Sequence, residues 1–238
     1  MTEIKVASIK AINSSAHGRV KIKSNPSFIQ SKNKHFAPVV VQEFIGASKE
    51  FPIVFIKDAE TGRFNAVVLL GLKPQENLFF DEKSWRGNYV PQALTLYPFV
   101  IHQAEGNDKA LLCVDEDSPL VNETAGEAFF DEKGVQKSWL TAKGEAIVNY
   151  VDNTSITQNF IKLLLSKELL MPQTLSLNLA GQDEYTLDGL YVINEQKFNT
   201  LSDGEFAELR KTNALPAIYA VLMSMQCINQ LIQRQSTK

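Results

Sequence analysis

Two strand-like segments joined by a short turn constrain the fold of this chain more than any other feature. Residues 52–56 (Pro-Ile-Val-Phe-Ile) and 64–72 (Phe-Asn-Ala-Val-Val-Leu-Leu-Gly-Leu) are rich in the β-branched and aromatic side chains typical of strands. Between them, residues 58–62 (Asp-Ala-Glu-Thr-Gly) contain the Asp and Gly that favour a turn. The pattern therefore predicts a β-hairpin.

Five further stretches are typical of antiparallel strands. Residues 4–12 alternate well enough between apolar and polar side chains for an edge strand. Residues 97–103 and 109–115 form a second predicted pair, and residues 173–180 and 184–194 form a third. We therefore expect an α+β fold with a mainly antiparallel sheet, short inserted helices and a helical C-terminal region.

Short helices are predicted between the strands of the first half. Residues 39–50 carry Val40, Phe44 and Ala47 at helical spacing and stop before Pro52, since a proline disfavours helix in the residue before it. Residues 92–97 lie between two prolines and predict a short helix that leads into a strand.

Two capping boxes mark helices in the second half. Ser155 and Gln158 have the spacing of such a box and predict a helix that buries Ile156 and ends at Met171-Pro172. Residues 202–205 (Ser-Asp-Gly-Glu) form another box, which predicts the start of the last pair of helices.

A long segment near the C-terminus carries no charge. Residues 212–233 contain Pro216 and several Ser, Asn and Gln side chains. One broad helical face is shared by Ile218, Val221, Leu222, Met225, Ile228 and Ile232. This pattern favours a helix packed against the core, and a membrane-facing or partner-facing surface is the alternative. We expect no transmembrane segment, and contacts between copies of this helix would form a homo-oligomer.

The composition is that of an ordinary globular protein, with 44% hydrophobic and 21% charged residues among 238. The formal net charge of −3 argues against nucleic acid as a partner, because phosphate binding needs a dense basic surface. Residues 1–20 lack the apolar core of a secretory signal, and the isolated Cys113 and Cys227 are typical of small buried side chains. We therefore expect a cytoplasmic protein, with export by a signal-independent route as the alternative.

One short sequence occurs twice. Residues 79–83 and 129–133 both read Phe-Phe-Asp-Glu-Lys, but the residues around them do not align. The repeated sequence is explained by two strand ends, each with buried Phe side chains and an acidic turn, and a duplicated unit is the alternative. We expect one domain over residues 1–238.

Local motifs for chemistry are absent from the sequence. His17, His35 and His102 lie far apart without the spacing of metal ligands, so we expect neither a metal nor a cofactor. The acidic runs at residues 115–117 and 131–132 lack the pattern of a calcium loop and are typical of solvated turns.

The most unusual composition lies in the aromatic segment, which we define as residues 85–99. Its Trp and Tyr side chains combine an apolar ring with a polar tip, which suits both a plug in the core and a ligand groove. The candidate residues for binding a ligand or partner are Trp85, Tyr89, Pro91 and Tyr97.

Several motifs follow one another in a fixed order over almost the whole chain. They are His17, Glu43-Phe44, Phe-Pro-Ile-Val-Phe at 51–55, Leu-Gly-Leu at 70–72, Asn-Leu-Phe at 77–79, Trp85, Tyr-Val-Pro at 89–91, Tyr-Pro-Phe at 97–99, Cys-Val-Asp-Glu at 113–116, Phe-Asp-Glu-Lys-Gly at 130–134 and Leu-Asp-Gly-Leu at 187–190. In this order the chain resembles the SapC family, named from a protein of bacterial surface-layer systems. It departs from the family at Leu94-Thr-Leu96, where relatives have Leu-Arg-Arg, so a guanidinium fork for an anion is missing there. The peptide-transporter permease of the same name is a different protein, since this chain lacks the several spanning helices of a permease.

The resemblance implies a place in surface-layer biogenesis, or in a nutrient-uptake or halogenase-associated pathway, without an established reaction. Our leading hypothesis is a non-catalytic binding or accessory protein that holds a protein partner or a small molecule. The first alternative is a metal-dependent enzyme, similar to the non-haem iron oxygenases, with His17, Glu43 and Asp115 as the catalytic candidates. The second alternative is a structural component of the surface layer.

Overall fold

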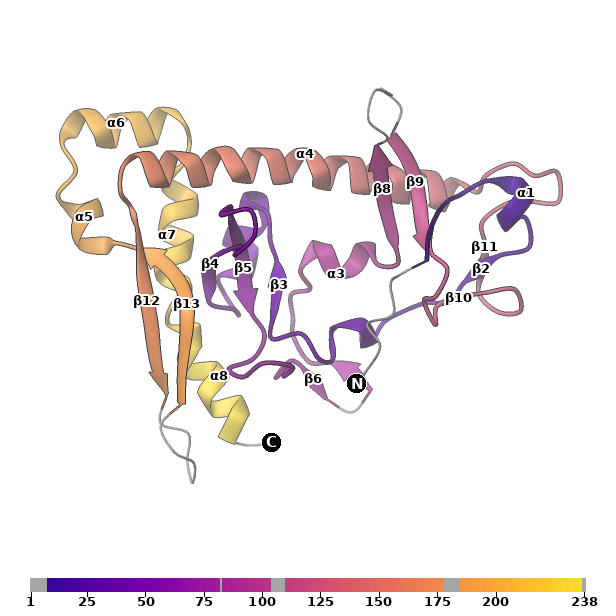
Figure 1. The fold of residues 1–238 in the computed structure, drawn as a ribbon, viewed down its shortest axis with the longest axis horizontal. Helices are drawn as coiled ribbons and strands as arrows, with labels where there is room; N and C mark the ends of the chain where they lie inside the picture. Colours follow the sequence, from indigo (N-terminus) through magenta and orange to yellow (C-terminus); the bar gives the residue numbers. More distant parts are fainter. Residues whose placement is uncertain (1–7, 82, 104–109, 178–184, 237–238) are drawn as a thin grey trace. The chain divides into compact units, whose positions relative to one another are not determined.

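The computed structural model describes residues 8–81, 83–103, 110–177 and 185–236 (Figure 1). The chain divides into two compact units: the first contains Met1–Pro26 and Thr95–Val151, and the second contains Ser27–Leu94 and Asp152–Lys238. The long helix α4 (Ser138–Ser166) contributes its beginning to the first unit and its end to the second. The single domain over residues 1–238 stays a prediction.

The second unit is built on a five-stranded antiparallel sheet. Its strand order is β12-β13-β4-β5-β3, with the pair β4–β5 joined as the predicted hairpin and the pair β12–β13 as the third predicted pair. Ile53 of β4 lies opposite Val68 of β5, and both side chains are fully buried. The strands are β3 (Phe36–Pro38), β4 (Ile53–Lys57), β5 (Phe64–Leu69), β12 (Leu170–Leu177) and β13 (Tyr185–Ile193).

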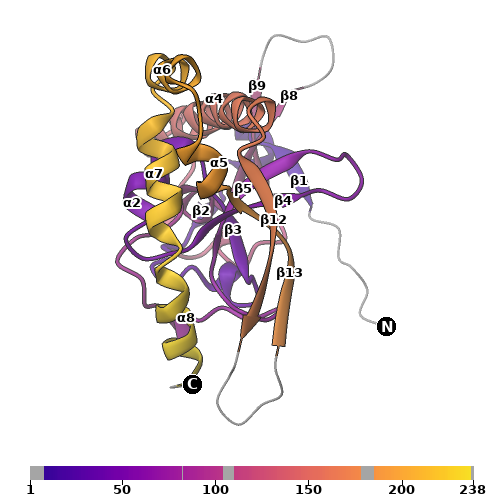
Figure 2. The same cartoon turned by 90° about the vertical axis from the view of Figure 1, so that its left-hand side faces the viewer.

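The second unit also contains short helices and one small hairpin, β6–β7. The helix predicted over residues 39–50 forms as a 3₁₀ turn, η2, followed by α2, and α7 packs against α2, β4 and β13. Figure 2 shows α7 and α8 running one after the other beside the sheet. The remaining elements are η1 (Ile29–Ser31), η2 (Val41–Glu43), α2 (Phe44–Ala47), β6 (Phe80–Asp81), β7 (Ser84–Trp85), α5 (Glu195–Asn199), α6 (Asp203–Lys211), α7 (Leu215–Ser224) and α8 (Cys227–Ser236).

The core of the second unit is rich in phenylalanine. Phe51 and Phe79 are fully buried, with their ring centroids 4.5 Å apart, and Phe44 meets Phe160 of α4 edge to face. Such aromatic pairs add roughly 0.5–1.5 kcal/mol beyond the burial of their area. The Phe44–Phe160 pair therefore ties α2 to α4, and the Phe51–Phe79 pair ties the residues just before β4 to those just before β6.

The first unit contains two small antiparallel sheets, in the orders β1-β9-β8 and β10-β2-β11. The predicted pair over residues 97–103 and 109–115 forms as β8 and β9, and β1 is an edge strand as predicted, although residues 4–7 lie outside the described residues. The elements are β1 (Ile9–Ala11), α1 (Ser14–His17), β2 (Lys21–Ile22), β8 (Phe99–Gln103), β9 (Ala110–Asp115), β10 (Val121–Asn122) and β11 (Glu127–Ala128). The predicted short helix forms as α3 (Gln92–Leu96) just before β8, and it begins in the second unit and ends in the first.

The two copies of Phe-Phe-Asp-Glu-Lys lie in different units. Phe79 and Phe129 are fully buried, and each copy stands at a short strand, the first at β6 and the second just after β11. Asp131 closes a turn by accepting backbone N–H bonds from Lys133 and Val135. These are the two strand ends with buried Phe that we expected, and the duplication stays an alternative.

The predicted start and end of the helix near residue 155 are wrong. Ser155 lies in the middle of α4, and the helix ends at Ser166, so Met171 and Pro172 belong to β12. The end is set by Glu168, whose φ of 54° is left-handed and stops the helical path. A Ser-x-x-Gln spacing is short enough to occur inside a longer helix, where packing of the buried face decides the boundaries.

The second capping box is confirmed. The Ser202 hydroxyl accepts from the backbone N–H of Glu205, and the Glu205 carboxylate accepts from the backbone N–H of Ser202. Within the described residues it begins a run of three helices, α6 to α8, and the prediction of a pair is wrong because the chain turns again at Met225 and Gln226.

The uncharged segment forms α7 and most of α8. Ile218 and Val221 are fully buried on the face that packs into the core, as predicted, while Tyr219 and Met223 are exposed. Among the described residues, Leu215–Ser236 is long and apolar enough to cross a membrane by length and composition alone, a test that core helices of soluble proteins also pass. Cys113 and Cys227 are both free and buried, as expected.

Candidate functional site

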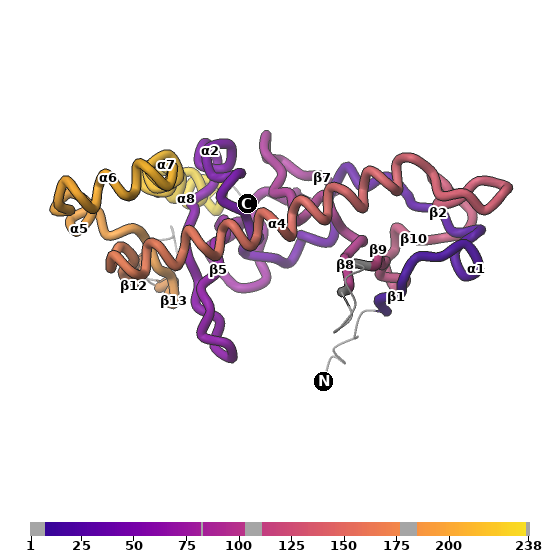
Figure 3. Tube along the Cα trace, turned by 90° about the horizontal axis from the view of Figure 1, so that it is seen from above, coloured from indigo at the N-terminus to yellow at the C-terminus, as the bar shows by residue number. Residues whose placement is uncertain are grey.

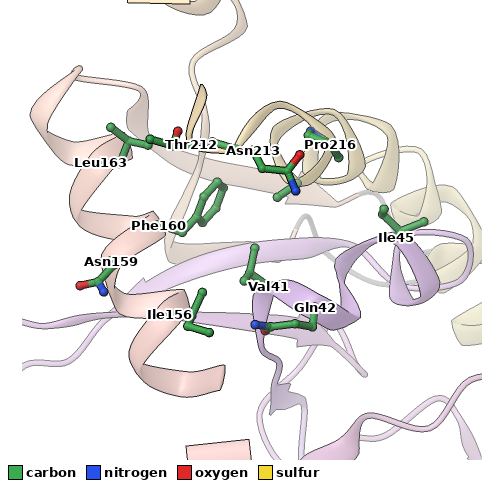
Figure 4. A pocket seen from close by; sticks show the side chains of 12 residues that line it. Val41, Gln42, Ile45, Ile156, Asn159, Phe160, Leu163, Thr212, Asn213 and Pro216 are labelled. Carbon is green, nitrogen blue, oxygen red and sulfur yellow. The ribbon is translucent and has the colours of Figure 1, made fainter. Parts of the chain in front are cut away.

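A pocket of about 520 Å³ opens in the second unit (Figure 4). Three elements surround it: the segment from η2 to α2, the second half of α4, and the turn between α6 and α7. Volumes of about 300–1,000 Å³ are typical of small-molecule sites. The lining residues are Val41, Gln42, Ile45, Ile156, Asn159, Phe160, Leu163, Thr212, Asn213, Ala214, Pro216 and Ala217.

Local hydrogen bonds fix the first two walls. The backbone N–H of Val41 donates to the hydroxyl of Thr157 at 2.8 Å, and that hydroxyl donates to the carbonyl of Asn153 one turn back in α4. This pair of bonds ties η2 to α4 at one side of the pocket. Phe160, Ala214 and Ala217 are buried at its base.

The third wall depends on a residue with a left-handed backbone. Asn213 has a φ of 56°, a conformation that Asn tolerates better than most residues. Beside it, the hydroxyl of Thr212 donates to the carbonyls of Glu208 and Leu209, and Pro216 stands in the first turn of α7. The turn therefore presents Asn213 and Pro216 to the pocket in a fixed geometry.

The chemistry of the pocket is apolar with a few amides. The Ile45 and Ile156 side chains are 60% and 50% exposed, which is unusual for such large apolar groups in walls of a hollow. The amides of Gln42 and Asn213 make no hydrogen bond to any other residue that the structure describes, so each offers a donor and an acceptor. Such a lining can bind an apolar group that carries a few polar atoms.

The aromatic segment is held by two buried carboxylates on η2 and the loop after α2. The Glu50 carboxylate accepts hydrogen bonds from two backbone N–H groups. That of Asn88 lies 3.1 and 2.8 Å from the two carboxylate oxygens, and that of Tyr89 lies 2.9 Å from one of them. Arg234 of α8 lies 3.7 Å from the same carboxylate and stacks over the Phe79 ring. A carboxylate that receives several backbone N–H bonds holds the donating loop in one conformation.

Glu43 fixes the next part of the same segment. Its carboxylate accepts from the backbone N–H groups of Val40 and Gln92, at 3.1 and 2.7 Å, and from the phenol of Tyr89 at 2.9 Å. Burial, and then the negative charge of Glu43, raise the pKa of the Tyr89 phenol far above its usual value. The Trp85 indole N–H donates to the carbonyl of Tyr89, so the loop is closed on itself.

The chain matches one known protein family over most of its length. The family model SapC matches residues 12–231. The chain belongs to the SapC family. No curated protein and no solved structure matches the chain. The match covers most of each unit and every residue that lines the pocket in this SapC family protein.

The predicted binding residues do not line the pocket of this SapC family protein. Trp85, Tyr89 and Pro91 lie together in the second unit, where Pro91 is buried and the other two are half-buried. Tyr97 belongs to the first unit. The contacts above show that Trp85 and Tyr89 connect the core to the loop, and their role in binding a ligand stays a prediction.

The three catalytic candidates divide between the two units. Glu43 lies in the second unit, whereas His17 and Asp115 lie in the first, where Asp115 accepts from the backbone N–H of Asp117. Among the described residues, no group of three or more His, Cys, Asp or Glu side chains could hold a metal ion. The metal-dependent enzyme stays a prediction that no described site supports.

His17 is a buried residue of the first unit with one clear partner. Its Nδ1 accepts from the backbone N–H of Asn13 at 3.3 Å, so Nε2 is the nitrogen that carries a hydrogen. Nε2 lies 3.3 Å from the Glu116 carboxylate but makes no hydrogen bond of normal geometry with a described residue. A hydrogen bond and the charge of Lys10, together with His17, keep the pKa of Glu116 below its usual value.

Sequence reasoning missed the pocket because its residues come from three distant parts of the chain. Ile156 was expected to be buried, and that expectation is wrong, since half of its surface is exposed in the pocket wall. The signal that could have found the site is an unpaired Gln or Asn beside apolar residues on a helix, as at Gln42 and Asn159.

Proposed function

We propose that this SapC family protein is a non-catalytic binding or accessory protein that holds an apolar ligand in the pocket between η2–α2, α4 and the α6–α7 turn. The observation that carries the proposal is the chemistry of the lining: all twelve residues are apolar or neutral and polar. General acid–base or nucleophilic catalysis needs titratable or activated groups at the reacting atoms. The lining therefore supports binding more than chemistry.

The ligand would be largely apolar with one or two hydrogen-bonding groups. Ile45, Ile156 and Phe160 offer apolar surface, and transfer of such surface from water favours binding by about 25 cal/mol per Å². The amides of Gln42 and Asn213 would orient the ligand, because each can both donate and accept.

Membership of the family supports the broader part of the proposal. A protein that holds a small molecule or a partner would serve the surface-layer, nutrient-uptake or halogenase-associated pathway that the resemblance implies. We propose that it does so in the cytoplasm. The exposed Tyr219 and Met223 on α7 support a second copy of the chain, or a protein partner, as a further contact of this module.

The neutral dye Nile red tests the pocket, because its fluorescence rises in apolar surroundings. We expect saturable binding to the wild-type protein, and about tenfold weaker binding to Ile156→Trp, whose indole would occupy the pocket. The matched control is Val148→Trp, a change at another exposed β-branched residue of α4 that does not line the pocket. Its affinity for the dye should equal that of the wild type.

Two outcomes would contradict the proposal. One is equal dye binding by the wild type and Ile156→Trp when both unfold at the same temperature. The other is absence of saturable binding by the wild type. A lysate fraction that the protein converts into a new product would identify an enzyme instead.

A further inference from the structure

A second hollow, of about 560 Å³, lies in the second unit between α4 and the turn that joins β4 to β5. It shares Asn159 with the apolar pocket but otherwise lies on the other side of α4. Figure 3, seen from above, shows the β4–β5 hairpin and the helices α6 and α7 on opposite sides of α4. Three cationic side chains line it, those of Lys57, Arg63 and Lys162, and all three are exposed. We refer to it as the basic hollow.

No acidic side chain lines the basic hollow. Among the described residues, none of its three cations forms an ion pair with a carboxylate. The nearby Asp58 is engaged in its own turn, where one oxygen accepts from the backbone N–H and the hydroxyl of Thr61, both at 2.7 Å. The hollow therefore concentrates positive charge in a protein whose net charge is −3.

The fold brings the three cations together from two elements. In the hairpin register Lys57 lies opposite Phe64, so Lys57 and Arg63 both stand at the turn end of β4 and β5. Gln158 of α4 donates to the carbonyl of Phe64 at 3.0 Å and fixes the helix to the hairpin there. Lys162 is four residues further along α4 and therefore lies on the same face as Gln158.

We propose that Lys57, Arg63 and Lys162 bind the phosphoryl group of a small organic phosphate. The guanidinium of Arg63 presents a planar fork for two oxygens, and the two ammonium groups add point charges. Like charges that line one hollow repel one another, and a bound dianion removes that repulsion. The Phe64 ring in the wall offers an apolar surface for the rest of the ligand, and a hollow fits a small molecule better than a flat membrane.

Calorimetric titration with pyrophosphate, at an ionic strength held constant with chloride, tests this proposal on the full chain. We expect saturable binding with a Kd of about 1 mM or tighter, and a weaker Kd for orthophosphate, which carries less charge. The triple variant Lys57→Gln, Arg63→Gln, Lys162→Gln should bind at least about tenfold more weakly. These side chains are exposed, so its unfolding temperature should stay close to that of the wild type.

The matched control removes the same charge elsewhere in the second unit. Lys32, Lys34 and Lys49 are also exposed and lie outside both pockets. The variant Lys32→Gln, Lys34→Gln, Lys49→Gln should keep the wild-type affinity for pyrophosphate within about twofold. Equal weakening in the two triple variants would show a general charge effect and overturn the site, as would the absence of saturable binding by the wild type.

A vesicle assay separates the small molecule from a lipid headgroup with the same chemistry. The variant Lys57→Gln, Arg63→Gln, Lys162→Gln is the hollow variant. Vesicles of phosphatidylglycerol should capture it to the same extent as the wild type, and so should vesicles of phosphatidylcholine. Capture by phosphatidylglycerol that depends on Lys57, Arg63 and Lys162, without binding of free pyrophosphate, would overturn the proposal in favour of a membrane surface. Neutral Nile red should bind the hollow variant as it binds the wild type, so this test is independent of the apolar pocket.

Discussion

Glu43 and Gln42 are neighbours in η2, and they differ in almost every physical respect. The Glu43 carboxylate is buried and accepts three hydrogen bonds, two from Tyr89 and Gln92 of the aromatic segment and one from the backbone N–H of Val40. The Gln42 amide is exposed in the apolar pocket and bonds to no residue that the structure describes. Side chains whose hydrogen-bonding groups are all satisfied build the fold here, and unsatisfied side chains beside them are free to bind a ligand.

The largest effect should follow removal of the Glu43 carboxylate. Glu43→Ala leaves the N–H groups of Val40 and Gln92 and the phenol of Tyr89 without their acceptor, and each buried unsatisfied group costs about 1–3 kcal/mol. We expect the free energy of unfolding in urea to fall by roughly 3 kcal/mol or more. Glu60→Ala, an exposed glutamate in the β4–β5 turn, is the control and should change it by less than about 0.5 kcal/mol. A small loss in Glu43→Ala would show that the loop is held by other contacts.

The second effect concerns the Tyr89 phenol and its dependence on pH. Its pKa in the folded protein is raised above the usual 10.0, first by burial and then by Glu43, so the neutral phenol is favoured in the fold. The stability that this provides is fully present below pH 10 and is lost as the pH rises above the usual pKa toward the raised one. The free energy of unfolding of the wild type, measured in urea, should therefore fall as the pH rises above 10.

Tyr89→Phe isolates that contribution. At neutral pH it removes one hydrogen bond to a charged acceptor, and we expect a loss of roughly 1.5–3 kcal/mol. The difference in free energy of unfolding between the wild type and Tyr89→Phe should shrink as the pH rises above about 10. A difference that stays constant from pH 7 to the alkaline limit of folding would exclude the phenol as its source.

The regular elements of the fold and the aromatic segment differ in how far the sequence predicts them. The hairpins, α3 and the Ser202 capping box follow from patterns that are contiguous in sequence, and the structure confirms them. The aromatic segment was recognised as unusual, but nothing in its own residues shows that Glu43 and Glu50 hold it. Both carboxylates stand in a largely apolar stretch, and a buried charge needs a partner, which is the physical signal that could have found this role.

The pocket and the long helix could not be predicted for a different reason. The residues 41–45, 156–163 and 212–217 meet only after the helices have packed, and no local pattern records that contact. The start of α4 at Ser138 is followed by a polar and weakly periodic stretch, so the Ser155 box was the stronger local signal although it lies inside the helix. Tertiary packing overrides local propensity at both places.

A smaller effect is expected at the pocket's turn. Asn213 has a left-handed backbone, in which an Ala side chain is strained by roughly 1–2 kcal/mol and Gly is not. Asn213→Ala should therefore lower the free energy of unfolding by about 1 kcal/mol, while Asn213→Gly should leave it nearly unchanged. Equal loss in both variants would mean that the Asn213 amide, and not its backbone, stabilises the turn. Both should weaken binding of a ligand that contacts this amide.

The smallest effect on stability should come from Gln42, and it provides the sharpest contrast with Glu43. Gln42→Ala removes an exposed amide that bonds to no described residue, so the free energy of unfolding should change by less than about 0.5 kcal/mol. Once a natural ligand with a polar group is known, the same variant should weaken its binding by about 1 kcal/mol, the value of one neutral hydrogen bond. Nile red, which the apolar walls bind, should keep its affinity within about twofold. A loss of stability in Gln42→Ala comparable to that in Glu43→Ala would remove the distinction between the two neighbours, because Gln42 would then belong to the framework and not to the site.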